Sequence, residues 1–323
     1  MKRRAFLGWL ALDAVSFLAI TSQSSARTPR VVVVGVTPIS QHLREAFSGS
    51  LADAGYTEGR NATIEYRDVD GRPELLPQLA EAIGRSDVDV VFARGGGAVA
   101  AMKKASERIP IVAVDLESDP VAAGFVQSLA KPGGNITGVF LDLPEVSGKQ
   151  LQLLREIIGP IARIAIVGDP VINAPQFQAT ESAARALTIQ TQALPLRSSS
   201  DIDAIIETAH KGRANAILLL SSPIVFYHRK RLGELTAKRS LPTVSMFSEF
   251  AQAGGLMAYG PSLREAFRLA GARVGRILQG ANPGDLPVER PAKFELLINA
   301  KTAKALRLTI PPSVLARAER VIE

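Results

Sequence analysis

Five loops of this chain are rich in Gly, Ser, Asp and Pro, and each follows a short apolar run. They are residues 37–40, 94–97, 115–120, 169–173 and 221–223. Backbone amides, hydroxyls and carboxylates orient a small ligand, while apolar walls bury it. Because open parallel sheets bind ligands outside the carboxyl ends of their strands, these loops predict a ligand cage rather than catalytic pairs.

The loop at residues 94–97 reads Arg-Gly-Gly-Gly and precedes an expected helix. Free amides at a helix N-terminus favour a carboxylate or phosphate, so Gly96 and Gly97 are candidate ligand contacts, together with Arg94. An ordinary strand-to-helix turn with a solvated Arg94 is the alternative. The spacing matches only part of a dinucleotide fingerprint, because Ala100 stands where the third glycine belongs.

Three acidic residues, Asp115, Glu117 and Asp119, lie within five positions. They could form a carboxylate or metal site, or they could cap their own loop, since Asp before Pro is a frequent turn former. The glycine and terminal glutamate of a calcium loop are absent, which favours Asp119 as a ligand or capping residue. The three histidines lack partners at metal spacing, and Ser222 lacks a nucleophile-elbow context. No catalytic residue, metal or cofactor is expected.

Residues 249–261 combine a short helix with an acidic start, a glycine pair, a strand and a Gly-Pro stop. This dense punctuation indicates backbone held near a ligand or a hinge. Glu249 either pairs with an ammonium group or favours the helix start, and Tyr259 either lines a cleft or packs at a hinge. We expect the Gly254-Gly255 break and the Gly260-Pro261 stop to lie where the chain returns toward the first lobe, and we expect this segment to couple solute contact to lobe closure.

The first 26 residues have the layout of a secretory signal: basic residues 2–4, an apolar run at 9–20, and small residues ending at Ala26. Arg3-Arg4-x-Phe6-Leu7 also resembles a twin-arginine signal, with general export as the alternative. A membrane anchor is the other reading, but the run is shorter than the ~20 residues of a spanning helix and contains Asp13. We therefore expect cleavage near Ala26 and a periplasmic protein.

Composition excludes several classes of function. The chain contains no cysteine, so disulfides, thiolate metal sites and thiol nucleophiles are absent. Its formal net charge is +7, part of which is lost with residues 1–26, and no block of like charges remains. Nucleic acid is therefore not an expected partner.

Short apolar runs alternate with helical periods along the whole mature chain, which predicts parallel sheets with helices on both faces. We expect an α/β protein of two similar Rossmann-like lobes joined by a hinge. The N-terminal lobe takes residues 27–140 with about 250–283, and the C-terminal lobe takes 141–249 with about 284–323. The expected strands are 31–36, 62–66, 88–93, 111–114, 136–139, 163–167, 189–196, 216–220, 243–246 and 294–298. The longer expected helices are 146–158, 175–187, 225–239 and 263–278.

Several sequence blocks occur in an order that resembles one family, the substrate-binding proteins of ABC transporters of the tryptophan/tyrosine-binding type. The blocks are residues 54–67, Asp119-Pro120-Val121, residues 129–138, 151–156, 241–242, 249–262 and 293–313. The resemblance covers essentially the whole mature chain, and the combination is far more specific than any single block.

This resemblance implies a type I periplasmic-binding-protein fold, with about three crossings between the lobes and the solute in the cleft. It implies a protein without catalytic activity that docks on an ABC permease in the inner membrane, and we expect a monomer or weak dimer. The expected solute is small and organic, amino-acid-like or a carboxylate. The expected ligand-binding residues are Thr37, Arg94, Gly96, Gly97 and Asp119 on one side, and Asn173, Ser221, Glu249 and Tyr259 on the others.

Three departures from the family pattern lie near the expected cleft. Gly96-Gly97-Ala98 stands where a hydroxyl residue and proline are common, Asp169 where Asn is usual, and Ser245 where an aromatic residue is expected. They indicate a smaller or differently charged solute than an aromatic amino acid. A periplasmic sensor for a receptor is the alternative function, followed by an α/β hydrolase or transferase.

Overall fold

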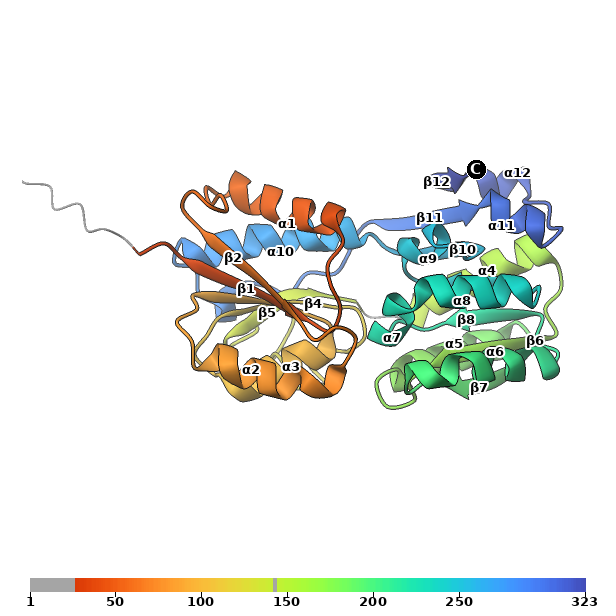
Figure 1. Ribbon diagram of the computed structural model, residues 1–323, viewed down its shortest axis with the longest axis horizontal. Coiled ribbons are helices and arrows are strands. Elements are labelled where there is room, and N and C mark those ends of the chain that lie inside the picture. Colours follow the sequence, from red (N-terminus) through yellow and green to blue (C-terminus); the bar gives the residue numbers. More distant parts are fainter. Residues whose placement is uncertain (1–26, 142–143) are drawn as a thin grey trace, which may run out of the picture.

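The computed structural model describes residues 27–141 and 144–323, which form two lobes placed end to end along the long axis (Figure 1). The expected export signal lies outside these residues. Each lobe is a mainly parallel sheet with helices on both faces. The predicted α/β fold with two similar lobes is therefore confirmed.

The first lobe is built on a five-stranded sheet in which all neighbouring strands are parallel. In spatial order its strands are β2 (Thr63–Asp68), β1 (Arg30–Gly35), β3 (Val90–Arg94), β4 (Ile111–Asp115) and β5 (Ile136–Phe140). The valine run of β1 is buried throughout, because alternate side chains enter the packed layers above and below the sheet.

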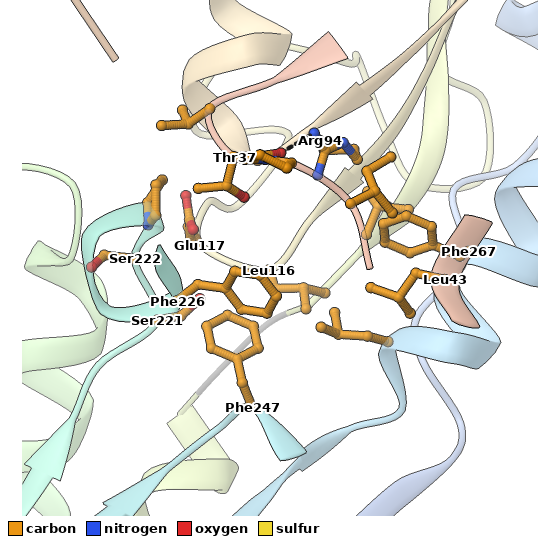
Figure 2. A pocket seen from close by; sticks show the side chains of 17 residues that line it. Thr37, Leu43, Arg94, Leu116, Glu117, Ser221, Ser222, Phe226, Phe247 and Phe267 are labelled. Atoms are coloured by element: carbon orange, nitrogen blue, oxygen red, sulfur yellow. Dashed lines mark hydrogen bonds between the residues drawn. The ribbon is translucent and has the colours of Figure 1, made fainter. Parts of the chain in front are cut away.

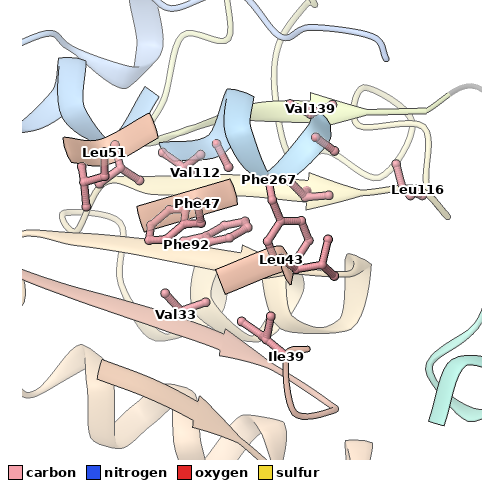
Figure 3. Close-up of a cluster of buried hydrophobic side chains, with 14 of the residues drawn as sticks. Val33, Ile39, Leu43, Phe47, Leu51, Phe92, Val112, Leu116, Val139 and Phe267 are labelled. Carbon is pink, nitrogen blue, oxygen red and sulfur yellow. The ribbon is translucent and has the colours of Figure 1, made fainter. Parts of the chain in front are cut away.

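Helices cover both faces of this sheet. Helices α1 (Gln41–Asp53) and α10 (Leu263–Leu278) lie on one face; η1 (Pro73–Leu75), α2 (Leu76–Gly84) and α3 (Gly96–Ala105) lie on the other. Under α1 and α10, Phe47 stacks on Phe92 at 4.9 Å between ring centroids, and Phe267 meets Phe92 edge to face at 5.2 Å (Figure 3). Aromatic rings bury large apolar areas, so α10 is an integral part of the first lobe's core although it comes late in the chain.

The second lobe has a seven-stranded sheet in which only β10 and β11 pair antiparallel. In spatial order its strands are β12 (Arg320–Ile322), β11 (Phe294–Asn299), β10 (Met257–Pro261), β9 (Thr243–Ser245), β8 (Ala216–Leu219), β6 (Arg163–Gly168) and β7 (Gln190–Pro195). The helices packed on one face are α4 (Pro144–Ile158), α5 (Ala174–Ala186), α11 (Ala300–Ala305) and α12 (Pro312–Leu315). The other face carries η2 (Ser199–Asp201), α6 (Ile202–Lys211), α7 (Pro223–Tyr227), α8 (Arg229–Lys238) and α9 (Ser248–Gln252).

The chain passes between the lobes after β5, after β10 and again before β11. Residues 284–289, which begin within η3 (Pro283–Asp285), still run along β5. There Glu289 N donates to Gly138 O at 2.9 Å. Sheet membership therefore places α9 and β10 with the second lobe and residues 284–289 with the first. The expected boundaries near residues 250 and 284 both fall earlier along the chain than these passages.

The glycine pair Gly254-Gly255 does not lie at a passage between the lobes. Gly254 has a φ of +107°, which suits the turn after α9, and a Cβ on Gly255 would come within 2.0 Å of the Phe250 ring. The pair stands at the amino end of β10, whereas the chain leaves the second lobe from the carboxyl end of that strand, at Pro261. The expected position of Gly254-Gly255 is therefore wrong, because these glycines serve a turn and the packing of Phe250, whereas Gly260-Pro261 does lie where the chain returns toward the first lobe.

Two further elements differ from expectation. The helix expected over residues 225–239 is divided into α7 and α8 at His228. Strand β12 is only three residues long and is held by pairing with β11, which local sequence cannot reveal. Among the described residues, no helix combines the length and the apolar character needed to cross a membrane.

Candidate functional site

A cavity of about 90 Å³ lies between the lobes, at the carboxyl ends of both parallel sheets (Figure 2). Loops of the first lobe, helices α1 and α10, and loops of the second lobe all contribute to it. Its walls are largely apolar and include Leu43, Leu116, Phe226, Phe247, Leu263 and Phe267. The polar side chains at the cavity are Thr37, Arg94, Glu117, Ser221 and Ser222.

Arg94 ends β3 and turns its guanidinium group toward the first lobe. Its Nη2 donates to Thr37 O at 2.5 Å, and a Cβ on Gly35 would lie only 2.6 Å from the same atom. Burial lowers the pKa of Arg94 to about 10, so the side chain keeps its charge at neutral pH. The structure therefore brings Thr37 and Arg94 together at the cavity, with the guanidinium tied to the first-lobe backbone.

Other side chains of the protein occupy the space around the glycines at the start of α3. A Cβ on Gly96 would lie 2.6 Å from Ser118 Oγ and 2.9 Å from Asp115 Oδ2, so a carboxylate of the chain already stands at this helix N-terminus. Gly97 faces Leu76 Cδ1, at 3.4 Å from a Cβ built on it. Neither Gly96 nor Gly97 lines the cavity, whereas Gly95 does.

Asp115 and Glu117 form an acidic pair where β4 ends. Asp115 is buried, and its Oδ1 accepts the Glu117 amide at 2.9 Å, while its Oδ2 has no hydrogen-bond partner in the described structure. Burial raises the pKa of Glu117 to about 8, and the nearby Asp115 carboxylate adds to the rise. Burial likewise raises the pKa of Asp115. The Glu117 side chain lies at the cavity, so this pair places one carboxyl group where a ligand would sit.

Asp119 lies away from this cavity. Its Oδ1 accepts the amides of Val121 at 2.8 Å and Ala122 at 3.1 Å, which is the capping arrangement weighed as one of its two roles. It borders a separate hollow beside Phe140 and Arg290. The structure therefore does not bring Asp119 together with the other predicted site residues.

Ser221 follows β8. Its backbone is held by Gln176 of α5 and by Asn173, the residue before that helix. Its amide donates to Gln176 Oε1 at 2.9 Å, and its carbonyl accepts Asn173 Nδ2. Asn173 is fully buried and outside the cavity lining, so its contact with the site runs through Ser221. Ser221 is 1% exposed, lines the cavity, and its Oγ has no hydrogen-bond partner in the part of the chain described.

Two aromatic rings form the second-lobe wall of the cavity. Phe226 from α7 and Phe247 from the loop after β9 meet edge to face, with 5.3 Å between ring centroids. Figure 2 shows both rings below Leu116, facing the cavity. Such rings supply apolar contact area with a defined shape.

The two remaining predicted residues stand beside the cavity rather than in it. Glu249 is buried in the first turn of α9, and its Oε1 lies 3.4 Å from Nε2 of His42 in the first lobe. Tyr259 stacks on Phe294 at 6.0 Å between ring centroids, and its carbonyl accepts Gln150 Nε2. Glu249 therefore makes a contact between the lobes, and Tyr259 packs within the second lobe.

A second contact between the lobes involves α7. Tyr227 Oη donates to Asp70 Oδ1 at 2.8 Å, and a Cβ on Gly71 would touch the same ring at 3.4 Å. Asp70 and Gly71 follow β2, so this contact joins the carboxyl end of one sheet to that of the other. With the His42–Glu249 pair, it holds the two walls of the cavity together.

Sequence reasoning missed the apolar wall of the site. Phe226 and Phe247 lie in segments whose helix and strand periods give no sign that the rings face a cleft. The sequence places Glu117 in one of the expected ligand loops, 115–120, but does not single it out from the acidic cluster there. Its position two residues after the end of β4 was the signal that could have identified it. Within residues 27–141 and 144–323, no group of three or more acidic or histidine side chains could hold a metal ion.

The fold and the site define a two-lobed protein that encloses a small solute. The chain matches the model of the ABC transporter substrate binding protein family over residues 30–322, and it therefore belongs to that family. Members of this family bind solutes for an ABC permease and are not catalytic. The predicted family and the absence of catalytic activity are confirmed.

The individual proteins that this chain resembles are 21–24% identical to it. A "Tyrosine-binding protein" of Clostridioides difficile (strain R20291) is 22% identical over 282 residues, covering 84% of this chain and 80% of that protein. A crystal structure of a conserved domain protein from Vibrio cholerae has a TM-score of 0.85 at 24% identity, covering 91% of this chain and all of that one. A structure from Streptococcus pneumonia in complex with L-Trp has a TM-score of 0.83 at 21% identity, with the same coverage. At these identities the solved structures show a shared periplasmic-binding-protein fold.

Proposed function

We propose that this protein is exported, captures a small organic solute between its two lobes, and delivers it to an ABC permease in the inner membrane. An amino acid with an apolar side chain is the leading solute class. The names of two relatives, which refer to tyrosine and to L-Trp, support an amino acid.

The observation that carries this proposal is a cavity with apolar walls and buried polar atoms that lack protein partners. Ser221 Oγ and Arg94 Nε belong to residues that line the cavity, and neither atom makes a hydrogen bond within the described chain. Buried polar atoms are nearly always paired, and leaving one unpaired costs about 1–3 kcal/mol. A solute with polar groups at one end and an apolar body would pair such atoms at the cavity while filling its aromatic side.

Cavity size narrows the solute. The cavity, which is partly open to solvent, has a volume of about 90 Å³, less than the roughly 150 Å³ of an apolar cavity that accepts benzene. In this arrangement of the lobes, the cavity fits a compact side chain such as that of valine or leucine. An indole ring requires a wider separation of the lobes, in line with the smaller solute expected from the sequence.

Contacts between the lobes support capture by closure. Tyr227 reaches Asp70, and His42 reaches Glu249, so the two walls enclose one cavity. A solute favours the closed state only through contacts that it makes in that state. A solute touching Glu117 in one lobe and Ser221 in the other meets this requirement.

The proposed location rests on residues 1–26 and on the family, whose members work outside the cytoplasm. We propose cleavage near Ala26 and a periplasmic mature protein that is a monomer or weak dimer. The intact mass of the protein recovered from the periplasm should correspond to a chain beginning near Arg27. A mass that retains the first 26 residues would favour an anchored form.

The central experiment is a search for the solute. Protein purified from its native periplasm is denatured, and the released small molecules are identified by mass spectrometry. In parallel, thermal unfolding of solute-free protein is measured with each of the twenty amino acids. A solute present at a hundred times its Kd adds about 2.7 kcal/mol, which corresponds to a shift of roughly 5–10 °C for a domain of this size.

Two matched variants separate binding from general stabilisation. Ser221→Leu fills the cavity beside the unpartnered hydroxyl and should abolish the shift, whereas Ser313→Leu, exposed on α12, should keep it. If the native protein releases no solute and no amino acid raises its unfolding temperature, the result contradicts solute capture. A shift that survives Ser221→Leu unchanged would move the binding site away from this cavity.

A further inference from the structure

The first-lobe wall of the cavity presents a carboxyl group rather than an anion-binding nest. Glu117 lies at the cavity, at the start of the loop that follows β4 (Figure 2). The Gly96 amide at the start of α3, which would suit a solute carboxylate, faces the chain's own Asp115 and Glu117 instead. An anionic group of a solute would therefore meet a carboxyl group at the place where a Gly-rich loop usually offers amides.

Arg94, the basic side chain at the cavity, does not form an ion pair with Glu117. Arg94 Nη2 donates to Thr37 O, and the guanidinium packs beside Gly35 on the first-lobe side of the loop. In Figure 2 the Arg94 side chain lies on the far side of Thr37 from Glu117. The groups nearest to Glu117 are therefore neutral or acidic, and it lacks an ion-pair partner among the described residues.

A second polar group converges on the same place from the other lobe. Ser221 is 1% exposed, lines the cavity and has an unpartnered Oγ, while its backbone is fixed by Gln176 and Asn173. A hydroxyl oxygen and a carboxylate are both acceptors for an ammonium group, which has three N–H donors. The apolar rings of Phe226 and Phe247 lie beside them and suit an uncharged body attached to that nitrogen.

We propose that Glu117 selects solutes bearing a cationic nitrogen on a compact apolar body, with Ser221 as the partner acceptor from the second lobe. The proposal rests on the proposed function and names the solute class of the same site. A solute ammonium would hold Glu117 in its ionised form by charge pairing, whereas an isosteric carboxylate without the amine offers no such pair and would repel the ionised form. Glu117 is the specificity-determining residue, and a carboxylate on the solute is tolerated only when the amine is present.

The test compares two trios of probes that differ only in their charged groups. L-leucine, isopentylamine and 4-methylpentanoate form one trio; L-phenylalanine, 2-phenylethylamine and 3-phenylpropanoate form the other. Binding to the mature full-length protein is measured by calorimetry for wild type, Glu117→Gln, Glu117→Asp and Glu81→Gln. Glu81 is exposed on α2, where it pairs weakly with Arg85, and serves as the matched control.

In wild type and Glu81→Gln, the amine-bearing probes of at least one trio should bind at least about tenfold more tightly than the carboxylate of that trio. Glu117→Gln should weaken the amine-bearing probes by at least about thirtyfold, since removing one partner of a buried charge pair is costly. It should leave the carboxylate unchanged or improve it. Glu117→Asp, which keeps the charge, should restore part of the selectivity. Glu117→Gln removes a carboxyl group that is costly to bury, so it should fold.

Other outcomes overturn the proposal in distinguishable ways. Carboxylates that bind as tightly as amines, or a Glu117→Gln variant with unchanged selectivity, refute the role of Glu117 but leave solute capture standing. A solute released from native protein that lacks a basic nitrogen does the same. If none of the six probes binds and no solute is released, the proposed function fails and this inference fails with it.

Discussion

The two walls of the cavity differ in kind. The first lobe contributes the ionisable side chains, Arg94 and Glu117, on loops held by backbone contacts. The second lobe contributes hydroxyls and aromatic rings, with Ser221 fixed by Gln176 and Phe226 packed on Phe247. The ionisable side chains that line the cavity therefore come from the first lobe, which also adds the Thr37 hydroxyl and the Phe267 ring.

This division has a physical consequence for closure. Arg94 keeps its first-lobe partner, Thr37 O, whichever way the second lobe moves, and the ion pair that the motion would break is His42–Glu249, which stands beside the cavity. The second lobe brings a neutral, apolar surface over the solute, which excludes water and strengthens the electrostatic contacts already made. Substitutions in the two lobes should therefore alter different properties, and the following predictions test that separation.

The largest expected effect concerns the packing that supports the second-lobe wall. Gly255→Val should lower the free energy of unfolding by about 3 kcal/mol or more, because a Cβ at this position lies 2.0–2.5 Å from three atoms of the fully buried Phe250 ring. Chemical denaturation measures this loss. Gly49→Ala, exposed in α1 with no atom within 4 Å of its Cβ, is the control and should gain up to about 1 kcal/mol.

This variant also separates stability from closure. If Gly255→Val folds as stably as wild type and changes only solute affinity, the glycine pair acts as a hinge after all. Loss of stability before any change in affinity per folded molecule supports the packing role. The distinction matters because the sequence alone suggested the hinge.

The next effect concerns the aromatic wall itself. Phe247→Ala should weaken an apolar amino acid by at least about tenfold, since burying a large apolar side chain contributes about 1.5–3 kcal/mol, and it should preserve the preference for amine over carboxylate. Calorimetry with the two probe trios measures both quantities. Phe125→Ala is the control: this ring packs on Phe140 outside the cavity and should affect stability alone. A change in charge selectivity in Phe247→Ala would contradict the division between the lobes.

Much of the fold was predictable because it rests on periodicity. The valine run of β1 is buried on both faces, and the helical spacing of Leu43, Phe47 and Leu51 puts all three in the core. Both patterns can be recognised from neighbouring residues alone, without knowledge of tertiary contacts. The division of α7 from α8 and the pairing of β12 depend on contacts with distant residues, which no local pattern records.

The site was predictable only in outline. Strand ends identified Thr37, Arg94 and Ser221, because carboxyl ends of parallel strands meet at one edge. The spacing of Gly96 could not reveal that Asp115 would occupy the helix N-terminus, since that depends on the neighbouring strand. Asp119 and Asn173 are polar residues at strand ends, but both form hydrogen bonds within their own loops, and Asn173 also donates to the Ser221 carbonyl.

A smaller effect follows from the acidic pair of the first lobe. Burial raises the pKa of Glu117 and of Asp115 above their ordinary values of 4.5 and 3.8, so the native state binds more protons than the unfolded state across that range. The free energy of unfolding of the solute-free protein should therefore fall as the pH rises from about 4 through neutrality, by the order of 1–2 kcal/mol.

Denaturation at pH 5 and pH 8 checks this sign. Asp115→Asn keeps an oxygen for the Glu117 amide and removes the neighbouring charge, which lowers the pKa of Glu117 and should reduce the pH-dependent loss. The difference between wild type and variant cancels groups that titrate elsewhere. Equal slopes in the two proteins would show that the acidic pair does not carry this dependence.

The smallest effect concerns the contact by which the second lobe reaches the first. Tyr227→Phe removes the hydrogen bond to Asp70 Oδ1 but keeps the ring against Gly71. An exposed hydrogen bond contributes about 0.5–1.5 kcal/mol, and this one joins the two lobes, so its loss should favour an open arrangement and lower solute affinity by a few-fold. Small-angle scattering should show a more extended solute-free molecule in the variant than in Tyr56→Phe, whose ring lies within the first lobe. Equal affinity and equal dimensions in both variants would remove Tyr227 from closure and leave His42 and Glu249 as the contact that joins the charged wall to the apolar one.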